Sequence, residues 1–311
     1  MTNHHRWLAA VLCAGVTLAA SSGALRAQAA RTVKMQTLNV RDILYVMTGH
    51  HNILALMRDE GVVLVDNKPA GWGKLVLDNI QGVTDQPVTT IINTSASLEH
   101  VSGNVDYPSV KQIVAHPKTQ ARMETLDAFR GPNARFLPNR LVTDRLSLLD
   151  GQDRLDIYHF GKGVTDGDLI VVFPEKRLAH FGDLFPSKSL PPVDAASGGS
   201  ALALPETLAR AIAELKNISR VTTGRMEDSA AMADPSSPSA IFANPKTMTW
   251  AETQEYADFT RDVVAAIRQA ATAGKSAEQA AASLQLPARY KDYDLSRAKE
   301  FTQLIYRELG R

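Results

Sequence analysis

The stretch Val88-Thr-Thr-Ile-Ile-Asn-Thr-Ser-Ala-Ser-Leu-Glu-His100 changes character near its midpoint. Its first half is rich in apolar and β-branched residues, which predicts a buried strand over 88–93. Its second half, Thr94-Ser-Ala-Ser-Leu-Glu-His100, is a short polar segment that ends in an acid and a histidine. We therefore expect a strand that runs directly into a loop carrying candidate functional side chains.

Apolar runs on both sides of this stretch predict a chain in which strands and helices alternate twice. Residues 43–47 and 52–57 flank a turn at 49–52 and predict a hairpin. Two mixed sheets with helices outside would bury this many apolar strands, so we expect an α/β sandwich. The other predicted strands are 61–66, 112–116, 141–149, 154–160, 169–173, 177–181 and 219–223, and the predicted helices are 72–80, 118–128, 205–216, 249–273, 276–284 and 295–309.

The first 29 residues have the features of a secretory signal peptide. A basic start at 1–6 precedes an apolar run at 7–20, and small residues follow up to Ala27-Gln-Ala29. The run is too short to cross a bilayer comfortably, although an uncleaved anchor is the alternative. The expectation is an exported protein, periplasmic or secreted, without membrane contact after cleavage. Cys13, the only cysteine, lies in this segment, so a metal site in the mature chain must use His, Asp or Glu.

The charge balance narrows the classes of partner. The chain has 311 residues, a net charge of +1 and no long Lys/Arg run. A surface without a basic patch is not typical of nucleic-acid binding, so we expect none. A small-molecule ligand or a protein partner remains, and the oligomeric state is not predicted.

Several motifs occur in an order that resembles the metallo-β-lactamase superfamily, over about residues 42–226. The resemblance implies an αββα sandwich over 30–247, with a helical extension at 248–311 packed on it. Among members of this fold, the chain looks most like the exported, hydrolase-like ones. The motifs that carry the resemblance are Gly61-Val-Val-Leu-Val-Asp66, Thr90-Ile-Ile-Asn-Thr94, Gly163-Val-Thr-Asp-Gly-Asp168, His180-Phe-Gly-Asp-Leu-Phe185, Asp194 with Gly198-Gly-Ser200, and Thr223-Gly-Arg225.

In this family, a His-x-His-x-Asp-His loop, two later histidines and a bridging Asp hold two zinc ions that share a hydroxide. By the resemblance, the two loop histidines fall on Ser95 and Ser97, and the later ones on Val164 and Arg225. Serine hydroxyls are weak zinc ligands, valine has no donor and arginine stays protonated. Four of the seven ligand positions are therefore degenerate, and the first zinc site should be lost. Asp66, at the end of a strand, should order the loop beneath this centre.

The second site keeps three candidate ligands, which are Glu99, His100 and the bridging Asp183. We expect no cofactor, because the Arg225 guanidinium should occupy the place of the second metal and pair with Asp183 or Glu99. The alternative is one divalent ion, zinc, manganese or iron, held by the three candidate ligands.

The remaining histidines have weaker functional interpretations. His50 and His51 lie on the tip of the predicted hairpin, at the mouth of the expected pocket, where they would contact a ligand or be solvated. His116 is expected to be structural. His159 could swing toward the site, and His180 would either pack in the core or form an outer hydrogen bond to it.

These residues favour a pseudoenzyme that lacks the dinuclear zinc centre and binds a ligand or acts through a partner. The alternative is a hydrolase of an ester, lactone or amide with a remodelled mononuclear or metal-free site. A nucleophile at Ser95 or Ser97 beside His100 is conceivable, but no nucleophile-elbow pattern surrounds them. The label of metal-dependent hydrolase would follow from the fold alone.

Overall fold

The computed structural model describes residues 31–38, 44–48, 51–186, 188–224 and 247–311. The predicted signal peptide, His50 and Arg225 lie outside these residues, and so does the proposed pairing of Arg225 with the acids. None of the described helices is long and apolar enough to span a bilayer.

The described strands form two mixed sheets. The seven-stranded sheet runs in chain order, antiparallel from β1 to β4 and parallel from β4 to β7. The six-stranded sheet has the order β13-β12-β11-β10-β9-β8, and β11 and β12 are its parallel pair. The first sheet contains β1 (Lys34–Thr37), β2 (Leu44–Thr48), β3 (Ile53–Leu56), β4 (Val62–Val65), β5 (Val88–Ile92), β6 (Gln112–Ala115) and β7 (Arg140–Leu141). The second contains β8 (Arg145–Leu148), β9 (Leu155–Tyr158), β10 (Ile170–Phe173), β11 (Leu178–His180), β12 (Arg220–Thr222) and β13 (Met248–Thr249).

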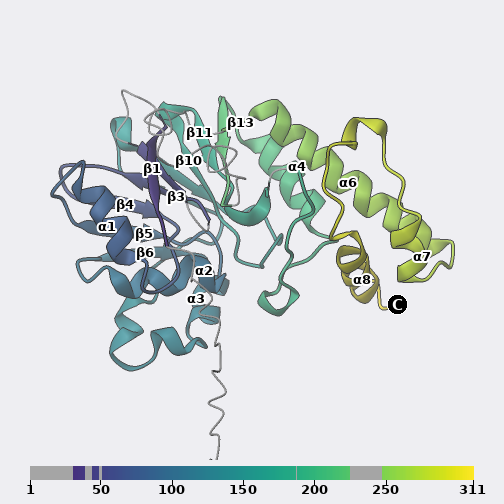
Figure 1. Ribbon diagram of the computed structural model, residues 1–311, viewed down its shortest axis with the longest axis horizontal. Coiled ribbons are helices and arrows are strands. Elements are labelled where there is room, and N and C mark those ends of the chain that lie inside the picture. The colour runs from purple at the N-terminus through teal and green to yellow at the C-terminus, as the bar shows by residue number, and fades with distance from the viewer. Residues whose placement is uncertain (1–30, 39–43, 49–50, 187, 225–246) are drawn as a thin grey trace, which may run out of the picture. The chain divides into compact units, whose positions relative to one another are not determined.

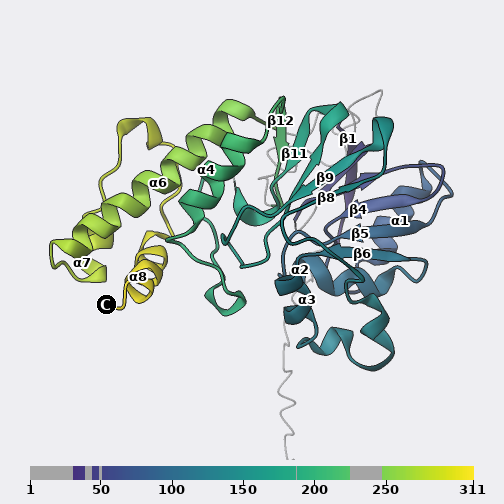
Figure 2. The same ribbon diagram turned by 180° about the vertical axis from the view of Figure 1, so that it is seen from behind.

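Helices cover the outer faces of both sheets, as Figures 1 and 2 show for α1 and α4. Between the sheets, Val63 of β4 and Val171 of β10 belong to one apolar cluster. Val76 of α1 packs on the outer face of the first sheet, and Leu208 of α4 packs on that of the second. The predicted αββα sandwich is therefore confirmed. The described α-helices are α1 (Gly73–Gln81), α2 (Leu98–Val101), α3 (Pro117–Met123), α4 (Leu204–Glu214), α6 (Trp250–Thr272), α7 (Ala277–Ala282) and α8 (Ala298–Glu308).

The C-terminal extension begins at a capping box in which Thr249 and Glu252 exchange hydrogen bonds. A second capping box begins α7, where the Ser276 hydroxyl accepts from the backbone N–H of Gln279. Tyr256 of α6 is fully buried in the apolar cluster that covers the second sheet. The extension thus packs on the sandwich, whereas the domain boundary at 247 stays a prediction.

Two predicted elements differ from the structure. The predicted strand 141–149 is two strands, β7 and β8, which belong to different sheets. Val142, between them, is buried in the cluster that both sheets share, so the chain crosses from one sheet to the other there. The predicted helix 118–128 ends at Met123, where the backbone N–H groups of Thr125 and Leu126 bond to carbonyls three residues back, at 3.1 and 3.0 Å.

Candidate functional site

The candidate site lies where several strands end and their loops meet. Asp66 follows β4, and the Thr94–His100 loop follows β5 within the same sheet. From the other sheet, Asp183 follows β11, and Gly224 follows β12. The backbone N–H of Gly224 donates to the Gly182 carbonyl at 2.8 Å, which ties the last two loops together.

Asp66 orders the loop that follows β5, as predicted. Its carboxylate is fully buried and accepts hydrogen bonds from the backbone N–H of Thr94 at 2.7 Å and from the Thr94 hydroxyl at 2.5 Å. Asp66 itself has a φ of 60°, a left-handed conformation that Asp tolerates better than most residues. The loop therefore leaves the strand in a fixed direction.

His100 lies between two carboxylates. Its Nδ1 is 3.2 Å from an oxygen of Asp66, and its Nε2 is 3.0 Å from an oxygen of Asp183. The His100 and Asp66 side chains are fully buried and that of Asp183 is nearly so. We call these three residues the Asp–His–Asp chain. Burial alone would lower the pKa of His100, but the charges of Asp183 and Asp66 outweigh it and raise that pKa well above its usual value.

The same contacts act on Asp66 in the opposite direction. Burial favours the neutral acid, but the contact with His100 and a longer one with His180 hold the pKa of Asp66 well below its usual value. His180 Nε2 is 3.6 Å from Asp66, and His180 Nδ1 is 3.0 Å from the Thr222 hydroxyl. His180 is thus an outer partner of the site, which is one of the two interpretations its sequence position allowed.

Glycines let the backbone close tightly around the Asp–His–Asp chain. A Cβ atom added to Gly224 would lie 2.9 Å from an Asp183 oxygen and 3.2 Å from His100 Cε1. Gly182 has a φ of 52°, and a Cβ there would lie 2.5 Å from the Thr94 hydroxyl. A side chain at position 224 would push Asp183 away from the imidazole, and one at position 182 would displace Thr94, which donates to Asp66.

His51 is buried against His100 rather than solvated on a hairpin tip. It is 4 % exposed, and the centroids of the two rings are 4.4 Å apart. Its Nε2 contacts the Asn67 carbonyl. Burial and the nearby charge of His100 lower the pKa of His51 to about 3. The hairpin is drawn inward because the backbone N–H of Asn52 donates to the Gly224 carbonyl at 2.8 Å.

Lys68 is a buried cation that the sequence did not single out. It is fully buried, and its ammonium donates to the Met47 carbonyl at 3.1 Å and to the His51 carbonyl. Burial lowers the pKa of Lys68 to about 7. A lysine in a polar segment after a strand usually points into solvent. The one local signal for Lys68 is that Pro69 follows it, because a residue before proline has a restricted backbone.

The positions that differ from the family motif supply no ligand set. Ser95 and Val164 are buried, and the Ser95 hydroxyl accepts from the backbone N–H of Ser97 at 3.3 Å, within its own turn. Glu99 is half-buried at the start of α2. In the part of the chain that the structure describes, no group of three or more His, Cys, Asp or Glu side chains is placed to hold a metal.

The residues present do not fit the two-metal centre of the family. Of the three predicted ligands of the second site, His100 and Asp183 lie in contact, with Asp66 behind the imidazole as an outer carboxylate would lie behind a metal ligand. Two donors are fewer than the three that catalytic zinc sites use. A single ion bound with Glu99 stays a prediction.

His159 does not point into the Asp–His–Asp chain. Its Nδ1 is 2.9 Å from the Asp168 carbonyl, and its ring stacks on His116 with a centroid distance of 4.1 Å. Burial and the neighbouring His159 lower the pKa of His116 to about 4. Burial raises the pKa of Asp168 to about 7, although the backbone N–H and the hydroxyl of Thr165 both donate to its carboxylate. This cluster supports the loop that carries Val164.

Comparisons with known proteins agree with this architecture. The family model of the metallo-beta-lactamase superfamily matches residues 47–226, more than half of the chain. Among solved structures, a metallo-beta-lactamase from Pontibacter korlensis has a TM-score of 0.57 and 15 % identity, over 74 % of this chain and 100 % of its own. The DIM-1 metallo-beta-lactamase has a TM-score of 0.55 and 12 % identity, over 74 % of this chain and 97 % of its own.

A longer enzyme matches more of the chain. The stereoselective inverting sec-alkylsulfatase Pisa1 from Pseudomonas sp. has a TM-score of 0.68 and 14 % identity, over 90 % of this chain and 50 % of its own. This chain thus spans about half the length of the sulfatase. No curated protein matches it. From the sheet order, the matched residues and the structural relatives, the chain belongs to the metallo-beta-lactamase superfamily.

Proposed function

We propose that this protein is an exported pseudoenzyme of its family, which keeps the site as a binding surface but does not hydrolyse substrates through a dinuclear zinc centre. The observation that carries the proposal is the Asp–His–Asp chain, in which carboxylates face both nitrogens of His100. Around it, Ser95, Ser97 and Val164 stand where the family has histidines.

Hydrolysis by this family depends on a metal-bound hydroxide near neutral pH. That hydroxide needs imidazole and carboxylate ligands at fixed positions, which serine and valine do not replace. The one loop histidine that remains already faces a carboxylate on each side. These contacts favour a site in which a charged, closely packed group of side chains takes the place of a metal centre.

A hydrolase of an ester, lactone or amide with a remodelled site is the second candidate. The contact between Asp66 and His100 Nδ1 is the arrangement that orients a general base. However, Asp183 faces Nε2, the nitrogen that would accept a proton from a nucleophile. This contact disfavours the second candidate.

Metal content and hydrolysis together test the proposal. The purified mature protein would be incubated with zinc, manganese or ferrous iron, dialysed and analysed for bound metal, beside Asp183→Ala. Asp127→Ala is the matched control, because its carboxylate is 87 % exposed and far from the site in sequence. We expect background metal in all three proteins and no turnover of p-nitrophenyl acetate, a γ-lactone or nitrocefin above buffer.

Two results would overturn the proposal. One is near-stoichiometric metal that Asp183→Ala loses and Asp127→Ala keeps. The other is hydrolysis that depends on His100, measured as loss of turnover in His100→Gln, which would establish the metal-free hydrolase instead. Mass spectrometry of the secreted protein tests export separately, with a mature chain starting after Ala29 as the expected result.

A further inference from the structure

The helical extension contains an open pocket of about 590 Å³ that is separate from the Asp–His–Asp chain. Figures 1 and 2 show α7 at the end of α6 that lies farther from the sheets, with α8 beside α7. The pocket lies between α8 and the turn that joins α6 to α7. Its lining residues are Gly274, Lys275, Ser276, Ala277, Gln303, Tyr306, Arg307 and Arg311.

The lining is cationic. Lys275, Arg307 and Arg311 line the pocket, and none of the lining residues is acidic. Among the described residues, Lys275 and Arg311 contact neutral oxygens. Lys275 donates to the Ser283 hydroxyl at 2.9 Å, and Arg311 donates to the Ala271 carbonyl. Their positive charge is therefore not neutralised by a carboxylate side chain within the pocket.

Other arginines of the extension behave differently. Arg261 lies 2.6 Å from Asp258, Arg289 lies 2.9 Å from Asp262, and Arg297 pairs with an acid on α8. Glu278, at the pocket edge, accepts from the Ser276 hydroxyl at 3.1 Å and is hydrogen-bonded to the side chain of Gln303, another lining residue. Glu278 and the α-carboxylate of Arg311, the last residue of the sequence, stand beside three cations, which leaves one positive charge in excess.

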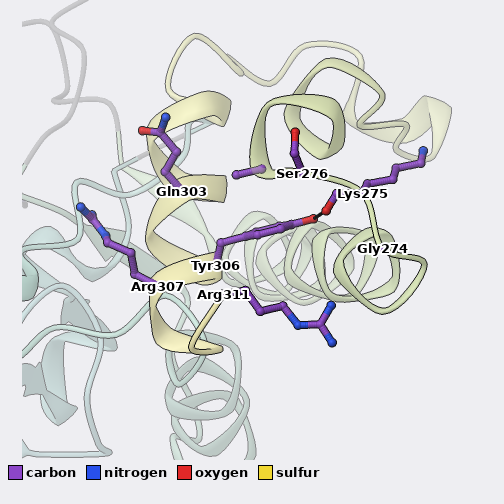
Figure 3. A pocket seen from close by; sticks show the side chains of 8 residues that line it. Gly274, Lys275, Ser276, Gln303, Tyr306, Arg307 and Arg311 are labelled. Carbon is purple, nitrogen blue, oxygen red and sulfur yellow. Dashed lines mark hydrogen bonds between the residues drawn. The ribbon is translucent and has the colours of Figure 1, made fainter.

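The floor of the pocket is preformed. The Tyr306 hydroxyl donates to the Lys275 carbonyl at 2.8 Å, which fixes the turn against α8, and Tyr306 is only 6 % exposed. Figure 3 shows Tyr306 crossing the middle of the pocket, with Arg307 on one side and Lys275 and Arg311 on the other. A ligand would find the apolar floor in place and charged side chains along two edges.

From this lining we infer that the pocket binds an organic oxyanion, a carboxylate, sulfonate or phosphate carried on an apolar body. The volume falls in the range of small-molecule pockets, so a bare inorganic anion would fill only part of it. The apolar body packs over Tyr306 and Ala277, and the oxyanion meets the cations at the edge. Arginine suits this role because its planar group recognises oxyanions with paired hydrogen bonds.

Calorimetry with 8-anilinonaphthalene-1-sulfonate tests the inference on the full mature chain. The probe carries a sulfonate on an aromatic body, and 1-anilinonaphthalene is its neutral analogue. We expect the double variant Arg307→Gln/Arg311→Gln to bind the sulfonate at least about tenfold more weakly. The loss of one charged hydrogen bond already weakens binding by about a factor of ten. Binding of the neutral analogue should stay unchanged.

Arg268→Gln is the matched control, because Arg268 is exposed on α6 and does not line the pocket. Competition by benzoate, benzenesulfonate and phenyl phosphate then distinguishes the three oxyanions. Equal sulfonate affinity in the double variant and the wild type would overturn the inference, as would an equal loss in Arg268→Gln. Circular dichroism checks that the double variant keeps its helices, and Lys275→Gln repeats the test if it does not.

Discussion

The buried amine of Lys68 makes a quantitative prediction about stability and pH. Its pKa falls from 10.5 to about 7 on folding, which corresponds to about 5 kcal/mol at roughly 1.4 kcal/mol per unit. Below pH 7 the amine is protonated in both states, so the folded state bears the whole cost of burying the charge. Above pH 7 the folded state releases the proton while the unfolded state keeps it to about 10.5. The free energy of unfolding should therefore rise with pH across this window.

Lys68→Met removes the amine but keeps the length of the side chain. It leaves the carbonyls of Met47 and His51 without this donor, at a cost of about 1–3 kcal/mol each that does not depend on pH. The pH-dependent part disappears. Between pH 7 and 9, the stability of the variant should fall relative to the wild type by roughly 2 to 3 kcal/mol, from two units at about 1.4 kcal/mol each.

Urea unfolding followed by circular dichroism at pH 6.5, 7.5, 8.5 and 9.0 measures this difference. Taking wild type minus variant cancels the pH dependence of groups that both proteins share, including His100. Lys216→Met is the control, because Lys216 is exposed at the end of α4. A constant difference between wild type and Lys68→Met over this range would refute the assignment of Lys68 as a buried, weakly basic amine.

Three further substitutions test the site and its support. Asp66→Asn should destabilise the protein by about 3–5 kcal/mol in urea unfolding, because it leaves His100 without one of its buried carboxylates. Gly224→Ala should lower the melting temperature, since its Cβ would lie 2.9 Å from an Asp183 oxygen; an unchanged value would show that this close packing is absent. Tyr256→Phe should be neutral or stabilising, because within the described residues the buried Tyr256 hydroxyl has no hydrogen-bond partner; a loss above about 1 kcal/mol would contradict this.

The backbone positions of the site were predictable because each follows a strand. A short apolar run that ends in a polar residue marks both the strand and the loop at its end, whereas the choice of Asp66, His100 and Asp183 as site residues rests on the resemblance to the family. Their contacts confirm that the loops converge. The assignment of each strand to one of the two sheets was harder to predict, as the separation of β7 from β8 shows. The alternation of apolar and polar residues identifies a strand but does not indicate which sheet it joins.

His51 and Lys68 show where sequence patterns stop being informative. Each lies in a polar segment that would be solvated in isolation, and each is buried because the hairpin closes over the end of β4. That closure depends on Asn52, whose backbone N–H and side-chain amide donate to Gly224 and Thr223, more than 170 residues away in the chain. Contacts between residues so far apart in the sequence leave no pattern in the neighbouring residues, so they are seen only in the folded chain.

The same closure explains how a site that lacks the family's histidines can keep its shape. In a metal centre, the cation holds opposing carboxylates together. Here the imidazole of His100 separates Asp66 from Asp183, and glycines at 182 and 224 bring the backbone within contact of that chain. A charged group already present in the protein thus takes part of the electrostatic role of an ion. The contacts of His100 with both carboxylates therefore fix how Asp66 and Asp183 lie around its ring.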